Sequence, residues 1–160
     1  MKKTILISLL ALSSTLSAEG VFSIGHKNFG FTLGTSSSYG NIYTVVGATV
    51  NYFILDNISV GTEYKGFFGS DPQIHQLTVP VTYHLPLENT TYKPYLGAFY
   101  NRTFISEPFN DYNIYGGRAG LSMQTSPNSF VSFGWVQEFS NDGKDVKSQG
   151  YPEVSGGFSF

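Results

Sequence analysis

The sequence predicts an all-β fold, an eight-stranded antiparallel up-and-down transmembrane β-barrel. Three observations support this prediction. Apolar and polar residues alternate with period two along most of the chain, which is typical of strands with two different faces. The alternating segments are about ten residues long, the length with which a tilted strand crosses a bilayer. Only 12% of the residues are charged whereas 16% are aromatic, an unusual balance for a water-soluble domain.

The N-terminal segment has the three parts of a secretory signal peptide. Lys2 and Lys3 form a positive region, residues 5–12 form an apolar core, and small residues lead to Ala18. The apolar core is too short for a membrane-spanning helix, which needs about 20 residues. We therefore expect residues 1–18 to be a cleaved signal peptide and residues 19–160 to form one outer-membrane β-barrel domain.

The predicted strands are separated by clusters of Gly, Pro, Asn, Asp and Ser, which favour turns. We expect eight strands, in chain order Asn28–Gly34, Ile42–Phe53, Ile58–Phe68, Gln76–Leu85, Lys93–Phe104, Tyr112–Gln124, Phe130–Phe139 and Tyr151–Phe160.

Alternating apolar residues justify each strand, except that the phase of the fifth stays open. In order, the apolar stripes of the other strands are Phe29, Phe31 and Leu33; Val46, Ala48, Val50 and Tyr52; Ile58, Val60, Thr62 and Tyr64; Leu77, Val79, Val81, Tyr83 and Leu85; Tyr115, Ala119, Leu121 and Met123; Val131, Phe133, Trp135 and Phe139; and Val154, Phe158 and Phe160.

The connections agree with an up-and-down barrel whose two termini lie on the inner side of the membrane. Such a barrel needs three inner turns and four outer loops. Short turns are expected at 55–57, 86–91 and 125–128, and they alternate with loops at 35–41, 69–75, 105–111 and 140–150. Ser140–Gly150 is the longest of the expected outer loops.

The segment Val21–Lys27 also alternates, but in a different phase. Phe22 and Ile24 stand on even positions, whereas Phe29 and Phe31 stand on odd ones. We interpret the shift as a bulge in a longer first strand, or as a lead-in on the inner side of the membrane. A ninth strand is disfavoured because bacterial single-chain barrels have even numbers of strands.

The face opposite the apolar stripes distinguishes a membrane barrel from a soluble sandwich or a lipocalin-like barrel. This face is rich in Gly, Ser and Thr and carries the charges of the strands, so we expect it to line a narrow lumen. We also expect aromatic residues at the strand ends to form two girdles at the membrane interfaces. They are Tyr39, Tyr43, Phe67, Phe68, Phe104, Tyr112 and Phe139 at one end, and Tyr52, Phe53, Tyr83, Tyr92, Tyr95, Phe130 and Phe160 at the other.

The last strand ends with apolar residues in alternation, Val154, Gly156, Phe158 and Phe160. This end resembles the signal that the barrel-assembly machinery reads in bacterial outer-membrane barrels, although Gly156 stands where a larger apolar residue is usual. The mature chain also resembles the small eight-stranded OmpA/OmpX-like barrels, and residues 93–98 are similar to a run in their central strands. It departs from the adhesive members, whose outer loops are longer.

The resemblance implies the outer membrane of a Gram-negative bacterium, with both termini in the periplasm. The expected partners are outer-membrane lipids and lipopolysaccharide, together with the secretion and barrel-assembly machinery during biogenesis. Nucleic acid is excluded as a partner, because the mature chain is acidic. Of the 9 basic residues, Lys2 and Lys3 belong to the signal peptide, so 7 basic residues stand against 11 acidic ones. We expect a monomer.

Five charged residues on the predicted inward face form the candidate site, Glu63, Lys65, Arg118, Glu138 and Glu153. In so narrow a lumen unpaired charges are costly, so we expect an interior charge network that closes the barrel rather than an ion path. Arg118 is the expected central residue, since its planar guanidinium serves two carboxylates.

Enzymatic activity is not expected. Lipid A deacylases of this fold carry a His-x-Ser-Asn motif, and this chain has Glu138 in place of that His, before Ser140 and Asn141. Without the His, Ser140 lacks the usual base. No metal site or other cofactor is predicted, because His26, His75 and His84 have no ligand spacing. We expect a non-enzymatic protein with a structural or surface-interaction role; the alternatives are a narrow channel for small or apolar solutes and a lipid A-modifying enzyme.

Overall fold

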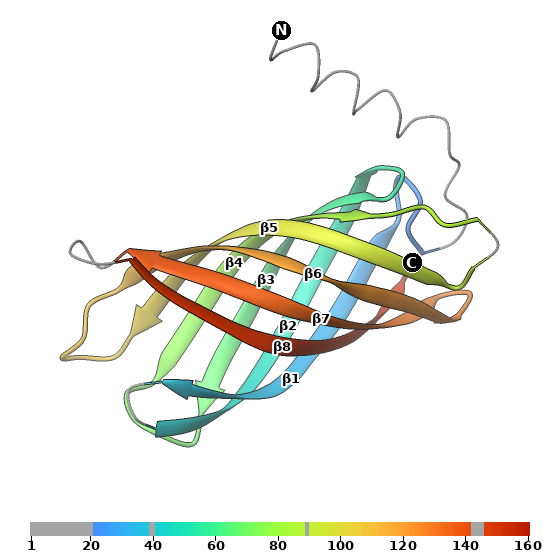
Figure 1. Ribbon diagram of the computed structural model, residues 1–160. Helices are drawn as coiled ribbons and strands as arrows, with labels where there is room; N and C mark the ends of the chain where they lie inside the picture. The colour runs from blue at the N-terminus through green and yellow to red at the C-terminus, as the bar shows by residue number, and fades with distance from the viewer. Residues whose placement is uncertain (1–20, 39–40, 89, 142–145) are drawn as a thin grey trace, which may run out of the picture.

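The computed structural model describes residues 21–38, 41–88, 90–141 and 146–160. These residues form eight antiparallel strands that pair in chain order, and β1 also pairs with β8, which closes a barrel (Figure 1). The predicted fold class is therefore confirmed. The strands are β1 Lys27–Ser38, β2 Asn41–Leu55, β3 Ile58–Phe68, β4 Ile74–His84, β5 Tyr92–Ile105, β6 Tyr112–Ser126, β7 Ser129–Asn141 and β8 Val146–Ser159.

The two ends of the barrel differ in their connections. The terminal end holds the start of β1, the C-terminus and the turns β2–β3, β4–β5 and β6–β7, and the loop end holds the other four connections (Figure 1). No helix in the described ranges is long and apolar enough to cross a membrane. The predicted signal peptide, residues 1–18, lies outside the described residues.

The loop end corrects one prediction. Ser140–Gly150, expected as the longest outer loop, is mostly a hairpin, since β7 continues to Asn141 and β8 begins at Val146. The ladder between these strands runs without interruption to Asn141 and Val146. The sequence hid this extension because a strand with water on both faces needs no apolar alternation.

Side chains alternate between the lumen and the outside as expected. In β3, for example, Ser59, Glu63 and Lys65 are buried whereas Tyr64 and Phe68 are exposed. The open phase of the fifth predicted strand is settled by burial, since Tyr95 and Phe99 of β5 point inward and Leu96 points outward. The sequence of β5 shows no clear apolar stripe because large rings, Tyr95 and Phe99, stand on its inward face while apolar residues such as Leu96 stand on its outward face.

The two aromatic girdles form only in part. Phe68, Phe104 and Phe139 at one end, and Tyr52, Tyr92 and Phe160 at the other, are exposed on the outer surface. Tyr83 also stands on the outward face of β4, where it is partly exposed, and Tyr39 lies outside the described residues. The remaining predicted members were assigned wrongly, because they stand on inward positions of their strands. These rings fill the two ends of the lumen instead: Tyr43, Phe53, Phe67, Tyr95, Tyr112 and Phe130.

Glycines leave the space that the inward rings of β5 occupy. A Cβ at Gly116 would meet the ring of Phe99, and a Cβ at Gly134 would meet Tyr95. The bulky residues of β5 and the glycines of the neighbouring strands β6 and β7 therefore complement each other along the inner wall of the barrel. Close packing of this kind is expected in a barrel of eight strands, whose interior is narrow.

The segment Val21–His26 is a lead-in and not a ninth strand or a bulge. It forms turns before β1, and Val21 and Phe22 are completely buried in the terminal end of the lumen. Phe22 packs against Phe53 and Phe130. The backbone N–H of Asn57 donates to the Phe22 carbonyl at 2.9 Å. The lead-in thus closes the terminal end.

Replacing Phe22 with Ala should destabilise the barrel by about 3 kcal/mol, because the change leaves a cavity among buried rings. Urea unfolding of the refolded protein in detergent, followed by tryptophan fluorescence, measures the effect. Ile24→Ala is the matched control, since Ile24 belongs to the same lead-in and is 56% exposed. Equal stability of the two variants would contradict a closing role for Phe22.

Candidate functional site: the charged interior

Four charged side chains meet in the middle of the lumen. Glu63 and Lys65 come from β3, Arg118 from β6 and Glu153 from β8. Lys65 Nζ lies 3.1 Å from Glu63 Oε1 and 3.0 Å from Glu153 Oε2. Arg118 Nη2 lies 2.9 Å from Glu63 Oε2, and its Nη1 lies 3.5 Å from Glu153 Oε1. Each cation therefore contacts both carboxylates, and we call this closed arrangement the charge square.

The sequence brings the square together by simple alternation. Glu63 and Lys65 are two residues apart in β3, so their side chains point to the same side of the sheet. The strands β6 and β8 present Arg118 and Glu153 from across the narrow lumen. The structure thus gives Lys65 the same double contact as Arg118, which sequence reasoning had singled out alone.

The guanidinium of Arg118 has two further features. Its Cζ atom lies 5.1 Å from the centre of the Phe99 ring, an arrangement that favours a cation. Its Nε has no hydrogen-bond partner among the described residues. The charge square is nearly inaccessible to water, since the side chains of Glu63, Lys65 and Glu153 are at most 6% exposed.

Glu138, the fifth predicted residue, stands apart from the square. It points into the lumen from β7, and its hydrogen-bond partner is not a cation but the hydroxyl of Tyr151, which donates to Glu138 Oε1 at 2.8 Å. Sequence reasoning missed Tyr151. Its inward position in β8, one alternation away from Glu153, was the available signal.

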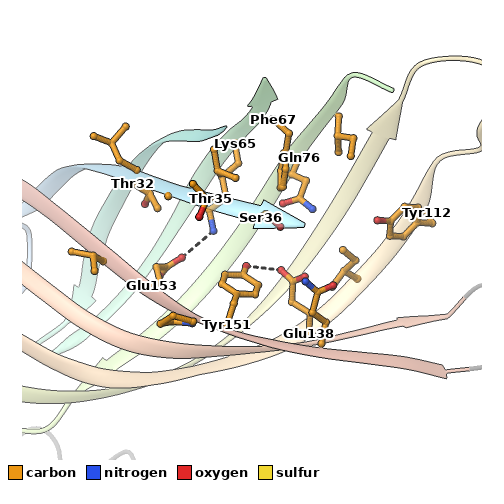
Figure 2. A pocket seen from close by; sticks show the side chains of 18 residues that line it. Thr32, Thr35, Ser36, Lys65, Phe67, Gln76, Tyr112, Glu138, Tyr151 and Glu153 are labelled. Carbon is orange, nitrogen blue, oxygen red and sulfur yellow. Dashed lines mark hydrogen bonds and ion pairs between the residues drawn. The ribbon is translucent and has the colours of Figure 1, made fainter. Parts of the chain in front are cut away.

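The charge square divides the lumen into two cavities of different size. On its terminal side a cavity of about 70 Å³ lies between the square and the rings of Phe53 and Phe130. On its loop side a cavity of about 310 Å³ is lined by Lys65, Glu138 and Glu153 together with apolar and neutral polar side chains. Figure 2 shows the ion pair of Lys65 with Glu153 and the hydrogen bond of Tyr151 to Glu138 in this larger cavity.

The residues of the predicted assembly signal lie on the last strand. Val154, Phe158 and Phe160 are exposed on the outer surface, with Phe160 72% exposed. The backbone of Phe160 exchanges two hydrogen bonds with Lys27, which joins the chain end to the first strand. Recognition of these residues, with Gly156, by an assembly machinery stays a prediction.

The three histidines and Ser140 form no common centre. His26 contacts Ser159, and His75 contacts Tyr64 on the outer surface. His84 is buried among the rings of the terminal end. Within the residues that the structure describes, no group of three His, Asp or Glu side chains is placed to hold a metal ion.

The fold of this chain is similar to that of several solved barrels. No protein-family model and no curated protein sequence matches the chain. Its structure is similar to the N-terminal β-barrel domain of Pseudomonas aeruginosa OprF, with a TM-score of 0.68 and 14% identity over 86% of this chain and 98% of that one. The chain has the fold of small eight-stranded outer-membrane barrels.

Two further solved barrels share the fold. Neisserial surface protein A matches with a TM-score of 0.56 and 18% identity, over 84% of this chain and 93% of that chain. The attachment invasion locus protein Ail of Yersinia pestis matches with a TM-score of 0.51 and 14% identity, over 86% and 99% respectively. The TM-scores establish a common fold. The sequence identities are too low to transfer a role, so the role of the charge square must be argued from its own chemistry.

Arg118→Ala should lower the stability of the folded barrel by about 3–5 kcal/mol, because it leaves Glu63 and Glu153 buried with one cation between them. Thermal unfolding in detergent measures the loss. Arg102→Ala is the control, since Arg102 pairs with Asp111 at 3.5 Å and both side chains are more than one third exposed. This surface pair should contribute at most about 1 kcal/mol. An unchanged melting temperature for Arg118→Ala would contradict the structural role of the square.

Proposed function

We propose that the protein is a non-enzymatic integral barrel of the bacterial outer membrane, with its termini in the periplasm and a structural role. One observation carries the proposal: the outer surface of the strands is apolar. Large apolar side chains in the middle of the strands are about half exposed or more, among them Leu96 at 61% and Val79 at 46%. Monomeric soluble proteins rarely expose apolar patches of this extent.

The distribution of charge supports the same location. In the described residues, the outward face of the strands carries charged side chains only near strand ends, at Lys27 and Arg102. The charges of the strand middles lie inside, in the charge square and at Glu138. A polar, filled interior with an apolar exterior is typical of an outer-membrane barrel and is the inverse of a soluble one.

The filled interior argues against the alternative of a channel along the axis. The charge square crosses the lumen at its middle, and Val21, Phe22, Phe53 and Phe130 pack together at the terminal end. The larger cavity of the loop side therefore does not continue to the terminal side as an open passage. We infer a closed barrel.

A surface-interaction role receives less support than a structural one. Ail is an attachment invasion locus protein by name, and Neisserial surface protein A is named for the surface. Here the hairpin of β7 and β8 takes up most of the segment that was expected to be the longest outer loop. Every described residue of that segment belongs to a strand, so its described part offers no irregular chain to a partner.

The barrel should not tolerate a charge on the middle of its outer face. Val79→Arg should reduce stability in dimyristoyl-phosphatidylcholine bilayers by about 2–4 kcal/mol, because the charge must enter the hydrocarbon core. Leu87→Arg is the control, since Leu87 is 44% exposed but lies in the β4–β5 connection. Heat-modifiable migration on a gel and urea titration report folding. Equal tolerance of both variants would indicate a soluble barrel.

In planar bilayers the refolded protein should give no discrete conductance steps, because the square and the aromatic closure both obstruct the lumen. Single-channel recording tests this directly. The double variant Phe22→Ala with Arg118→Ala removes parts of both obstructions and serves as the comparison. Steps from the parent protein that match those of the double variant would contradict the closed barrel.

A further inference from the structure

The ladder that closes the barrel is short. The strands β1 and β8 are joined by five residue pairs, from Asn28 and Ser159 to Thr32 and Ser155. Both strands continue beyond this point, but within the described residues they pair only with β2 and β7. Figure 1 shows β1 and β8 separating toward the loop end.

Pro152 keeps β8 from pairing with β1 again toward the loop end. Lys27 and Phe160 exchange two backbone hydrogen bonds, and bonded and non-bonded pairs alternate along antiparallel strands. Every second residue of β8 counted from Phe160 therefore directs its N–H toward β1, and Pro152 is one of them. Proline has no N–H, so the edge of β8 cannot bond to β1 there. Pro80 interrupts the β3–β4 ladder in the same way, but pairing resumes at Glu63 and Thr78.

The larger cavity reaches the outer surface through this separation. Its lining includes Leu33 and Val154, which face outward and are 69% and 50% exposed, as well as inward residues such as Phe67 and Ile114. Gly34 is exposed although it follows the buried Thr32 on the inward face of β1. The volume of about 310 Å³ is at the lower end of the range for small-molecule sites, roughly 300–1,000 Å³.

The charges of this cavity select one kind of head group. Lys65 is occupied by Glu63 and Glu153, so it offers no free charge to an anion. Glu138 has a hydrogen bond from Tyr151 but no ion pair among the described residues, and it lines the cavity. A partly buried carboxylate favours a cationic hydrogen-bond donor. The rim, by contrast, is apolar at Leu33 and Val154.

We propose that this opening binds a single-chain amphiphile from the membrane, with its ammonium head beside Glu138 and its aliphatic chain passing between β1 and β8 into the lipid. The inference rests on the proposed membrane location, because the chain leaves the barrel sideways. The closed terminal end makes the site a pocket and not a passage.

The site is tested with the isotope-labelled barrel in dimyristoyl-phosphatidylcholine nanodiscs, by NMR titration with n-octylamine and with n-octanoate. Octylamine should produce saturable shifts at the amides of Glu138 and Tyr151, whereas octanoate should produce none. Glu138→Gln should weaken octylamine binding about tenfold or more, since a hydrogen bond to a charged group is lost. Glu88→Gln, an exposed carboxylate in the β4–β5 connection, should bind as the parent does.

Two further variants test the place and the route. Gly34→Trp should abolish binding by filling the opening, since a Cβ at Gly34 would meet no atom within 4 Å. Gly117→Trp on the outer face of β6 is its control. A disulfide between Leu33→Cys and Val154→Cys should close the opening and weaken binding at least tenfold. The same bond between Phe31→Cys and Gly156→Cys, which are already paired, should leave binding unchanged.

Non-saturable shifts with both amphiphiles, equal affinity for octanoate, or full binding by Glu138→Gln or Gly34→Trp would overturn the site. Full binding by the barrel closed between positions 33 and 154 would overturn the lateral route. Heat-modifiable migration of every variant separates these results from a failure of the membrane proposal, because a chain that does not fold into the bilayer shows no shift on the gel.

Discussion

Lys65 and Arg118 each contact both Glu63 and Glu153, and the interior of the barrel is organised around these four contacts. Eight strands enclose a lumen that side chains must fill, and a charge left single there would carry a large desolvation penalty. A closed square of two cations and two carboxylates satisfies both requirements. It also connects β3 with β6 and β8, which are not neighbours in the sheet.

The remaining interior follows from the position of the square. Toward the terminal end, a small cavity separates the square from the rings of Phe22, Phe53 and Phe130, which exclude water from that end of the lumen. Toward the loop end, Phe67, Tyr43 and Ile74 pack together near the strand ends, and a larger cavity remains between them and the square. The glycines facing Phe99 and Tyr95 allow large rings in so narrow a space.

The ladder between β1 and β8 is the shortest in the described barrel. All other neighbouring strands pair along most of their length, whereas β1 and β8 share five pairs at the terminal end. The backbone hydrogen bonds of Phe160 and Lys27 hold this junction where the lead-in also packs. Beyond it Pro152 prevents bonding, and Glu138, which the square does not need, faces the resulting space. Two residues at the end of the chain thus act on this junction: Phe160 bonds to β1 at the terminal end, and Pro152 cannot bond to β1 toward the loop end.

The sequence by itself determined the fold class, the number of strands and the inward position of the five charged residues. Period-two alternation carries this information, because the side of the sheet that a residue faces depends only on its parity within a strand. The same rule would have placed Tyr43, Phe53 and Phe67 inside, but their aromatic character at strand ends suggested girdles. The extension of β7 and β8 was hidden because no apolar face marks a strand that lies in water.

Only the tertiary structure decided which inward residues meet. Glu63, Lys65, Arg118 and Glu153 become partners through the register of strands that are distant in the sequence, and register is a property of the whole closed sheet. The exclusion of Glu138 from the square, its bond with Tyr151 and the burial of Phe22 depend on the same register. Parity could be predicted from each strand alone, whereas contacts across the lumen required all eight strands in place.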